Sequence, residues 1–239
     1  MREDLPSPEE LRERLEGVLA RITLSARRAK RQPEEITLIA VSKTHPSEML
    51  KRAIEAGVTD LGENRVQEAE AKITEIGTER VRWHLIGHLQ SNKARRAVSL
   101  FEMIHSLDSK ELALRLDRLC KEEGRDVLPV LIQVDLAGET TKTGISEGEL
   151  PELVEQVASC EHLRLKGLMT LPPFFEDAEK ARPFFQRLRE LRDRYKAMGA
   201  FGDALGELSM GMSNDFEVAV EEGATMVRVG TAIFGKRGV

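Results

Sequence analysis

The sequence predicts an α/β fold, a single (β/α)8 barrel that takes up residues 1–239 as one domain. First, eight short apolar segments alternate with longer amphipathic segments, as in parallel strands joined by crossover helices. Second, no long linker separates these elements. Third, no glycine-rich dinucleotide-binding motif follows the first strand, which weakens the alternative of an open, doubly wound sheet.

The first element is a helix predicted over residues 8–31. Ser7 and Glu10 have the spacing of a capping box, and Pro8 suits the first helical turn. Apolar residues then recur at helical spacing: Leu11, Leu15, Val18, Leu19 and Ile22. Because the sequence ends soon after the eighth predicted strand, we expect this helix to fill the place of the eighth barrel helix.

Strands and helices alternate from there on. Apolar runs predict strands over residues 36–42, 58–61, 81–86, 102–106, 128–135, 164–169, 206–209 and 226–229. Amphipathic segments predict helices over residues 46–56, 64–76, 90–98, 109–123, 146–159, 176–197 and 213–222. Four glycines lie where helices should end: Gly57, Gly77, Gly124 and Gly199. Two helix starts have candidate caps: Asp108 or Ser109, and Ser213 or Asn214.

Composition excludes several classes of protein. Hydrophobic residues make up 41% and charged residues 32%, which predicts a packed core. A net charge of −5 gives no electrostatic case for nucleic acid or an anionic membrane as partner. No apolar run approaches the roughly 20 residues of a membrane span, and the N-terminus lacks the apolar segment of a secretory signal. Cys120 and Cys160 have no metal or redox spacing, so we expect buried or half-buried thiols in a cytoplasmic protein.

Lys43 follows the first predicted strand in the stretch ITLIAVSKTHP. In a barrel, this position lies on the working face, at the carboxyl end of the strands. A partly desolvated lysine favours the neutral amine, which can attack an aldehyde and form a Schiff base. The alternative is a lysine whose chain covers the strand end while its ammonium group stays in water.

Two loops rich in Gly, Ser and Thr follow the seventh and eighth strands, SMGMSND and RVGTAIFG. Barrels often bind phosphate between these loops, and Ser213, Gly230 and Thr231 could supply hydroxyl and N–H donors. Alternatively, the glycines only make tight turns and Ser213 only caps a helix. Together with Lys43, the loops predict a site for a phosphorylated aldehyde, for which pyridoxal 5′-phosphate is the obvious candidate.

Arg228 lies in the apolar eighth strand, where an unpaired charge is costly. It could donate to a pyridine nitrogen, or it could form a structural salt bridge across the barrel. His84 and His88 are four residues apart, but on a strand and a glycine turn they would not share a face. No third ligand has a suitable spacing, so we expect no metal site.

Seven segments carry a resemblance to a known family: AVSKTHP, LGENRVQEAEAK, WHLIGHLQSNK, IHSLDS, VDLAGETTKTG, GLMTL and LSMGMSNDFEVAVEEGATMVRVGTAIFG. In this order they resemble the pyridoxal phosphate homeostasis protein family, over residues 8–237. The resemblance implies the fold of the alanine racemase N-terminal barrel, also called fold type III. It also implies a cofactor, pyridoxal 5′-phosphate (PLP).

The resemblance implies roles at matching positions. Lys43 would carry the cofactor as an internal aldimine, and Arg228 would meet the pyridine nitrogen. Asn64 would lie beside the cofactor. The phosphate would be held by Ser213, Gly230 and Thr231, with backbone help from Met212.

The resemblance further implies a role in the balance of vitamin B6 and amino acids. Alanine racemase adds a β-domain with a catalytic tyrosine, and we expect no such domain in this chain. The single tyrosine, Tyr195, falls in a predicted helix. Racemisation needs acid–base groups on both faces of the substrate carbanion. We therefore expect a monomeric PLP carrier without catalytic residues, with apo PLP-dependent enzymes as possible recipients. The alternative is a PLP-dependent amino-acid racemase.

Overall fold

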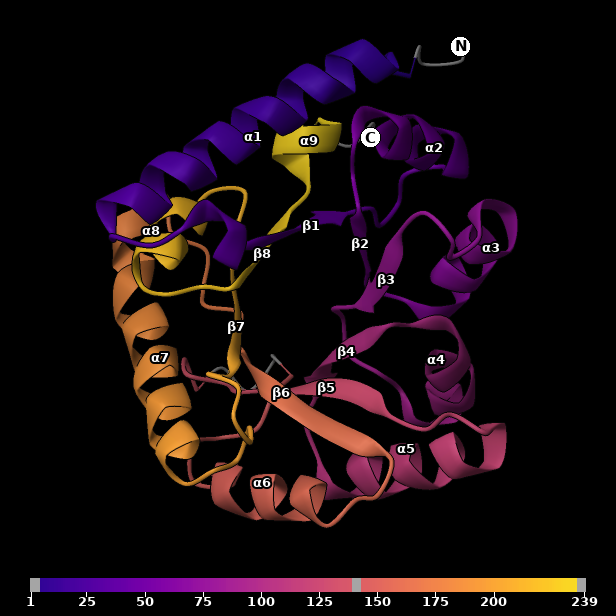
Figure 1. Cartoon of the computed structure of the whole chain (residues 1–239), viewed down its shortest axis with the longest axis vertical. Coiled ribbons are helices and arrows are strands. Elements are labelled where there is room, and N and C mark those ends of the chain that lie inside the picture. The colour runs from indigo at the N-terminus through magenta and orange to yellow at the C-terminus, as the bar shows by residue number, and fades with distance from the viewer. Residues whose placement is uncertain (1–4, 139–142, 236–239) are drawn as a thin grey trace.

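Eight parallel strands close into a barrel within residues 5–138 and 143–235, which are the residues that this computed structural model describes. Each strand pairs with the next, and β8 pairs with β1 (Figure 1). The strands are β1 Thr37–Val41, β2 Asp60–Glu63, β3 Arg82–Leu85, β4 Met103–Leu107, β5 Leu128–Gln133, β6 Leu163–Met169, β7 Glu207–Met212 and β8 Met226–Val229. The predicted fold class is therefore confirmed.

Helices surround the barrel on the outside (Figure 1). They are α1 Pro8–Arg28, α2 Ser47–Ala56, α3 Val66–Ile76, α4 Ala94–Leu100, α5 Lys110–Glu123, α6 Leu150–Ala158, α7 Arg182–Ala197, α8 Phe216–Glu221 and α9 Thr231–Phe234. Three short 3-10 helices accompany them: Pro33–Glu35, Ser91–Lys93 and Ala178–Ala181. None of the helices in the described ranges has the length and apolar character that crossing a bilayer requires.

Helix α1 closes the outer ring. Its N-terminus has the predicted capping box, in which Ser7 Oγ accepts from the Glu10 N–H and the Glu10 carboxylate accepts from the Ser7 N–H. The helix packs against α2 on one side and α8 on the other, and α9 lies beneath it (Figure 1). This confirms that the first helix fills the place of the eighth barrel helix.

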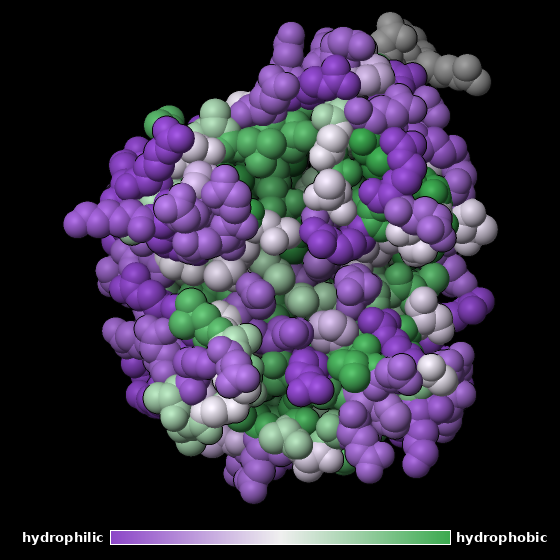
Figure 2. Space-filling model, viewed as in Figure 1, coloured by the Kyte–Doolittle hydropathy of each residue, from purple (hydrophilic) through white to green (hydrophobic). Residues whose placement is uncertain are grey.

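Two apolar clusters fill the part of the molecule that the structure describes. The larger one lies between the strands and the outer helices. The smaller one consists of strand residues that alternate with members of the larger cluster, and they therefore face the barrel interior: Ile39, Met103, Leu131, Met169 and Met226. On the face shown in Figure 2, hydrophilic residues dominate the rim, and hydrophobic residues show mainly toward the middle.

Both cysteines are free thiols, as expected. Cys120 is buried and Cys160 is half-buried. Burial raises the pKa of each thiol to about 11, so both stay protonated at neutral pH.

Several predicted element ends are wrong. Ser213 and Asn214 do not cap α8, because the helix begins at Phe216 with Asp215 at its N-cap. Helix α6 begins at Leu150, because residues 146–149 form a turn in which the Glu149 carboxylate accepts from the N–H and hydroxyl of Ser146. Helix α9 was not predicted, because four residues are too few for a periodic pattern.

Candidate functional site

A cavity of about 240 Å³ lies at the carboxyl ends of β1, β7 and β8. It brings together six of the seven predicted site residues: Lys43, Met212, Ser213, Arg228, Gly230 and Thr231. Its other lining residues are Val41, His45, Phe174, Asn214, Asp215 and Gly235. We call it the Lys43 cavity. Residues from both halves of the sequence meet here because β8 closes the barrel against β1.

Asn64 is the seventh predicted residue, and it does not line the Lys43 cavity. It follows β2 and lines a separate cavity of about 720 Å³ with Arg65, Gly87 and His88. The backbones of Asn64 and Gly87 are in close contact, since a Cβ atom on Gly87 would lie 2.5 Å from the Asn64 carbonyl oxygen. This packing fixes the loop after β2 against the loop after β3.

The backbone on both sides of Lys43 is tethered. The Ser42 N–H donates to the Gly62 carbonyl at 3.0 Å, and the Thr44 N–H donates to Glu68 Oε1 at 2.5 Å. Thr44 has φ of +68°, a left-handed conformation that is costly for a threonine. The tethers therefore hold a sharp turn that sets the direction of the half-buried Lys43 side chain.

A buried ionic cluster supplies the tether at Thr44 and also holds the Ser42 carbonyl. Lys72 Nζ donates to Glu63 Oε1 and Glu68 Oε1, each at 2.7 Å, and to the Ser42 carbonyl at 2.8 Å. Burial raises the pKa of Glu63 above its ordinary value, although Lys72 and Ser42 oppose the shift. Burial also acts to raise the pKa of Glu68, but the hydrogen bonds from Lys72 and the Thr44 N–H outweigh it and lower that pKa.

The loops after β7 and β8 are joined to each other. The Gly230 N–H donates to Ser213 Oγ at 3.2 Å. Helix α9 begins at the next residue, Thr231, and the N–H groups of a first helical turn have no carbonyl partner within their own helix. A Cβ atom at Gly230 would lie 3.3 Å from the Val41 carbonyl oxygen, so this position favours glycine. Hydroxyl and N–H donors thus gather at one end of the cavity.

Asp215 is a cavity residue that the sequence analysis missed. Its Oδ1 accepts from the N–H of Met212 at 2.6 Å, so that N–H is engaged within the turn. Burial raises the pKa of Asp215, while Met212 and the Arg228 charge oppose the shift. Arg228 in the neighbouring strand could have predicted Asp215, because a buried cation favours a nearby carboxylate.

Arg228 lies deep in the site, facing the barrel interior. Its Nη1 donates to Ser209 Oγ at 2.5 Å, and its Nη2 donates to the Thr170 carbonyl at 2.9 Å. Burial lowers its pKa to about 10, and the Asp215 charge opposes the shift. The guanidinium therefore stays charged at neutral pH. Among the described residues, its hydrogen bonds go to uncharged oxygens, which does not match the alternative of a structural salt bridge.

His45 and Phe174 also line the cavity and were missed. The rings of His45 and Phe234 lie 4.9 Å apart between centroids, so the histidine packs on α9. Phe174 belongs to the loop after β6 and is 74% exposed at the cavity edge. No periodic signal marks these positions, because loop residues converge only once the barrel has closed.

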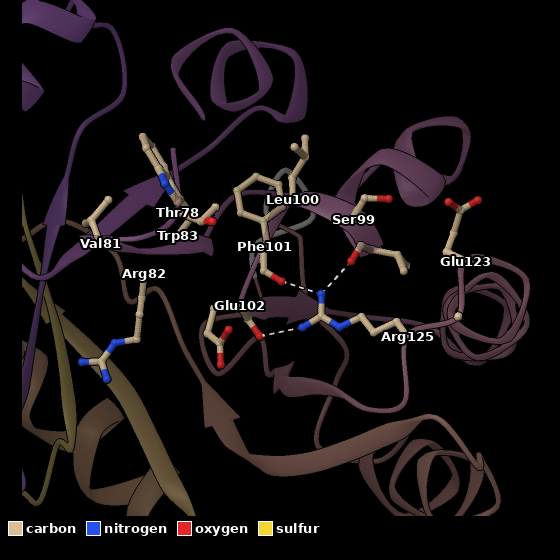
Figure 3. A pocket seen from close by; sticks show the side chains of 12 residues that line it. Thr78, Val81, Arg82, Trp83, Ser99, Leu100, Phe101, Glu102, Glu123 and Arg125 are labelled. Atoms are coloured by element: carbon tan, nitrogen blue, oxygen red, sulfur yellow. Dashed lines mark hydrogen bonds between the residues drawn. The ribbon is translucent and has the colours of Figure 1, made fainter. Parts of the chain in front are cut away.

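A third cavity, of about 510 Å³, lies at the opposite end of the barrel, where α3, α4 and α5 lead into β3, β4 and β5 (Figure 3). Arg125 turns its guanidinium onto the carbonyls of Val98, Phe101 and Glu102, at 2.6, 2.7 and 3.1 Å. Its donors thereby close the end of α4. Arg125 therefore has a structural role at this end of the barrel.

The donor set of the Lys43 cavity fits the predicted cofactor. A lysine amine, a buried arginine and a group of hydroxyl and N–H donors match an aldehyde, an aromatic ring nitrogen and a phosphate, respectively. Gly230 packs its backbone against Val41, which brings the end of β1 next to the loop after β8. Among the described residues, no group of three or more His, Cys, Asp or Glu side chains could hold a metal ion.

Comparison with known proteins gives concordant results. The model of the family described as alanine racemase, N-terminal domain, matches residues 19–238. The chain is 44% identical to the pyridoxal phosphate homeostasis protein of Aquifex aeolicus over 227 residues, which is 94% of this chain and 97% of the relative. It is 42% identical to the protein of the same name from Escherichia coli K12 over 226 residues, 93% of this chain and 95% of the relative.

Solved structures extend the likeness to three dimensions. PipY of Synechococcus elongatus with PLP bound has a TM-score of 0.81 at 38% identity, covering 94% of this chain and all 100% of PipY. An alanine racemase from Clostridium difficile has a TM-score of 0.71 at 18% identity, covering 97% of this chain and 58% of the racemase. The second likeness shows a shared fold.

Proposed function

This chain belongs to the pyridoxal phosphate homeostasis protein family, and from that premise we propose that it binds pyridoxal 5′-phosphate in the Lys43 cavity. One observation carries the proposal: a single cavity contains Lys43, Arg228 and the joined Ser213–Gly230 loops. The PLP bound to PipY, a relative of closely similar fold, supports the choice of cofactor. When bound, this cofactor supplies an aldehyde for covalent attachment and a conjugated ring.

Lys43 Nζ is the proposed point of attachment through a Schiff base. The tethers at Ser42 and Thr44 fix the backbone on either side, so the Lys43 side chain leaves the backbone in a fixed direction. A fixed direction of the Lys43 side chain favours a single geometry of attachment to the aldehyde carbon of the cofactor.

Arg228 is the proposed partner of the ring nitrogen. Its guanidinium stays protonated and can only donate, so the ring nitrogen would remain an acceptor without a proton of its own. A ring in that state withdraws electrons weakly. This property favours holding the cofactor over using it to stabilise a carbanion.

The phosphate end is assigned to Ser213, Gly230 and Thr231, with the Met212 backbone beside them. The Met212 N–H must leave Asp215 if it is to donate to the phosphate. Asn64, from the neighbouring cavity, would approach the cofactor from the loop after β2.

We further propose that the protein stores and delivers PLP without turnover, as a monomer in the cytoplasm, with apo PLP-dependent enzymes as recipients and amino-acid balance as the outcome. Tyr195 is buried on α7 and does not line the cavity. A racemase would need a second acid–base group opposite Lys43.

Borohydride reduction followed by peptide mass spectrometry tests the binding site. The wild-type protein should gain one pyridoxyl group on Lys43, and Lys43→Ala should lose both the adduct and the visible absorbance. Lys93→Ala is the matched control, because Lys93 lines the neighbouring cavity and should not affect either signal. An adduct on another lysine, or an unchanged Lys43→Ala spectrum, would refute the assignment.

Proton exchange tests the absence of turnover. Single-enantiomer amino acids are incubated with the PLP-loaded protein in deuterated water, and α-deuterium is measured by NMR. No exchange beyond that of free PLP is expected. Exchange at enzymatic rates that disappears in Lys43→Ala would establish the racemase alternative instead.

A further inference from the structure

A chain of hydrogen bonds crosses the barrel interior and ends on Arg228. Asp60 Oδ1 lies 2.9 Å from His84 Nε2, and His84 Nδ1 lies 3.1 Å from His105 Nε2. His105 Nδ1 lies 2.9 Å from Ser209 Oγ, which accepts from Arg228 Nη1 at 2.5 Å. We call these five residues the interior relay. It connects β2, β3, β4, β7 and β8.

The relay occupies space that barrels of this class usually fill with apolar side chains. Its members are no more than 3% exposed. Burying so many polar groups is costly unless every donor meets an acceptor. The proton positions along the relay are therefore strongly constrained.

The two ends of the relay determine its direction. Arg228 can only donate, and an ionised Asp60 can only accept. The His84 Nε2–H must therefore donate to Asp60, which leaves His84 Nδ1 as an acceptor for the His105 Nε2–H. His105 Nδ1 then accepts from the Ser209 hydroxyl, whose lone pairs face Arg228. With both imidazoles neutral, only this arrangement satisfies each contact.

The surroundings favour the required charge states. Burial acts to raise the pKa of Asp60, but hydrogen bonds from His84, Arg82 and Thr59 outweigh it and hold that pKa well below its ordinary value. Both Asp60 oxygens accept from Arg82, each at 2.8 Å. Burial, with the charge of Arg228 adding to it, lowers the pKa of His105 well below 6.5, so its ring stays neutral at pH 7.

We propose that Asp60, His84, His105 and Ser209 are positioning residues that hold Arg228 in place for the cofactor's ring nitrogen. The inference rests on the proposed function for the role of Arg228. The relay turns the lone pairs of Ser209 toward one guanidinium nitrogen, while the Thr170 carbonyl holds the other. Arg228 is thus fixed at two points, and its remaining N–H groups are directed by them.

The relay also joins the two ends of the barrel. Its outer partner, Arg82, is exposed and lines the cavity shown in Figure 3, at the amino ends of the strands. Arg228 lines the Lys43 cavity at the carboxyl ends. The aligned dipoles stabilise the cation at one end and the anion at the other.

Nitrogen-15 NMR of the histidine rings tests the relay in the cofactor-free protein. His84 and His105 should both carry the proton on Nε2 at pH 7, with unprotonated Nδ1. Ser209→Ala should move the Nδ1 resonance of His105, because that nitrogen loses its donor. A proton on His105 Nδ1 in the wild type would overturn the inference whether or not PLP binds.

PLP titration followed by visible absorbance tests the coupling to the site. Ser209→Ala should weaken binding roughly tenfold, the effect of one hydrogen bond to a charged group, and should shift the absorbance band. Ser209→Thr keeps the hydroxyl and should restore much of the affinity. Ser106→Ala is the matched control, because Ser106 is a buried serine on β4 that donates to the Gly87 carbonyl outside the relay.

The outcomes separate the two proposals. If the wild-type protein forms no adduct on Lys43, the proposed function fails while the NMR result still decides the relay. If the wild type binds PLP but Ser209→Ala behaves like Ser106→Ala in affinity and absorbance, the positioning role is refuted.

Discussion

Lys72 is a buried residue that holds the backbone next to Lys43 in place. Its ammonium group joins two carboxylates to the carbonyl of Ser42, the residue before Lys43. Glu63 is fully buried, and its Oε2 has no hydrogen-bond partner among the described residues. The charge of Lys72 is therefore the main compensation for a buried anion.

Lys72→Met should lower the free energy of unfolding by about 3–5 kcal/mol, because Glu63 loses its buried counter-charge. Urea denaturation measures the loss. The double variant Glu63→Gln/Lys72→Met should recover part of it, since no buried charge remains. Lys51→Met, which breaks an exposed pair with Glu75, serves as control and should leave the midpoint unchanged. Equal behaviour of the two single lysine variants would contradict this account.

His105 should make stability depend on pH. Because burial lowers its pKa well below 6.5, the unfolded chain binds a proton below about pH 6.5 that the folded protein does not. The free energy of unfolding should therefore fall as the pH falls below that value, by up to about 1.4 kcal/mol per pH unit from this group.

Urea denaturation of the wild type and His105→Gln, at about pH 7.5 and 5.5, isolates the His105 contribution. The wild type should lose more stability on acidification than the variant. The raised pKa values of Glu63, Asp108 and Asp215 act in the opposite direction, but they are common to both proteins. Identical losses would contradict a neutral, buried His105.

At the residue scale, the sequence predicted the residues that follow strands better than those inside the barrel. The sequence could place Lys43, Ser213, Gly230 and Thr231 near one another, because a barrel brings strand-following loops together on one face. The partners of His84 and His105 could not be found. They depend on the stagger between neighbouring strands, which includes irregular register between β4 and β5 and between β7 and β8.

At the scale of elements, the packing of β7 against α8 is unusually close. Gly211 has φ of +90°, and a Cβ atom there would lie 2.5 Å from the Cβ of Ala219 and 2.9 Å from the Cα of Phe216. The glycine allows the strand to lie directly against the helix. Asp215 occupies the N-cap position of that helix, and the turn that it closes by accepting from the Met212 N–H forms one wall of the Lys43 cavity.

Gly211→Ala should destabilise the protein by roughly 3 kcal/mol or more, because backbone strain and overpacking add. Gly124→Ala is the matched control: Gly124 has φ of +68° at the end of α5, but nothing lies within 4 Å of an added Cβ. It should cost about 1 kcal/mol from strain alone. Thermal denaturation compares the two, and equal losses would show that contact with α8 is unimportant.

Element starts and ends were predictable where a local side chain sets them. Ser7 with Glu10 at α1 and Ser109 at α5 cap their helices as expected. Glycines are the C-caps of α2, α3 and α5, whereas the C-cap of α7 is Met198, one residue before Gly199. The start of α8 was wrong because three polar residues in a row, Ser213, Asn214 and Asp215, can each cap a helix. The contacts of the folded loop decide which of the three residues occupies the N-cap position.

At the scale of the whole molecule, the fold class was predictable because eight alternating segments leave few topologies. Right-handed crossovers and a closed sheet then determine the strand order. The sequence pattern does not reveal that the barrel interior is divided into an apolar cluster around Met103 and a polar relay around His105. Strand patterning distinguishes buried from exposed faces, and both of these groups are buried.

Cofactor binding should stabilise the whole barrel. PLP at about 100 times its dissociation constant should add about 2.7 kcal/mol to the free energy of unfolding, equivalent to roughly 5–10 °C in melting temperature for a chain of this size. Differential scanning calorimetry measures the shift. Lys43→Ala should show a much smaller shift at the same PLP concentration. An equal shift in both proteins would place the stabilising site elsewhere.

The location of the Lys43 cavity at the junction of β8 and β1 has a consequence for biosynthesis. During translation, Lys43 leaves the ribosome early. Arg228, Gly230 and Thr231 follow only after most of the chain has been made. In the proposed binding mode, a nascent chain therefore offers the Lys43 amine before it has the residues proposed to hold the phosphate. In that binding mode, PLP binds only after the last strand has closed the barrel, so the PLP-bound protein is fully folded.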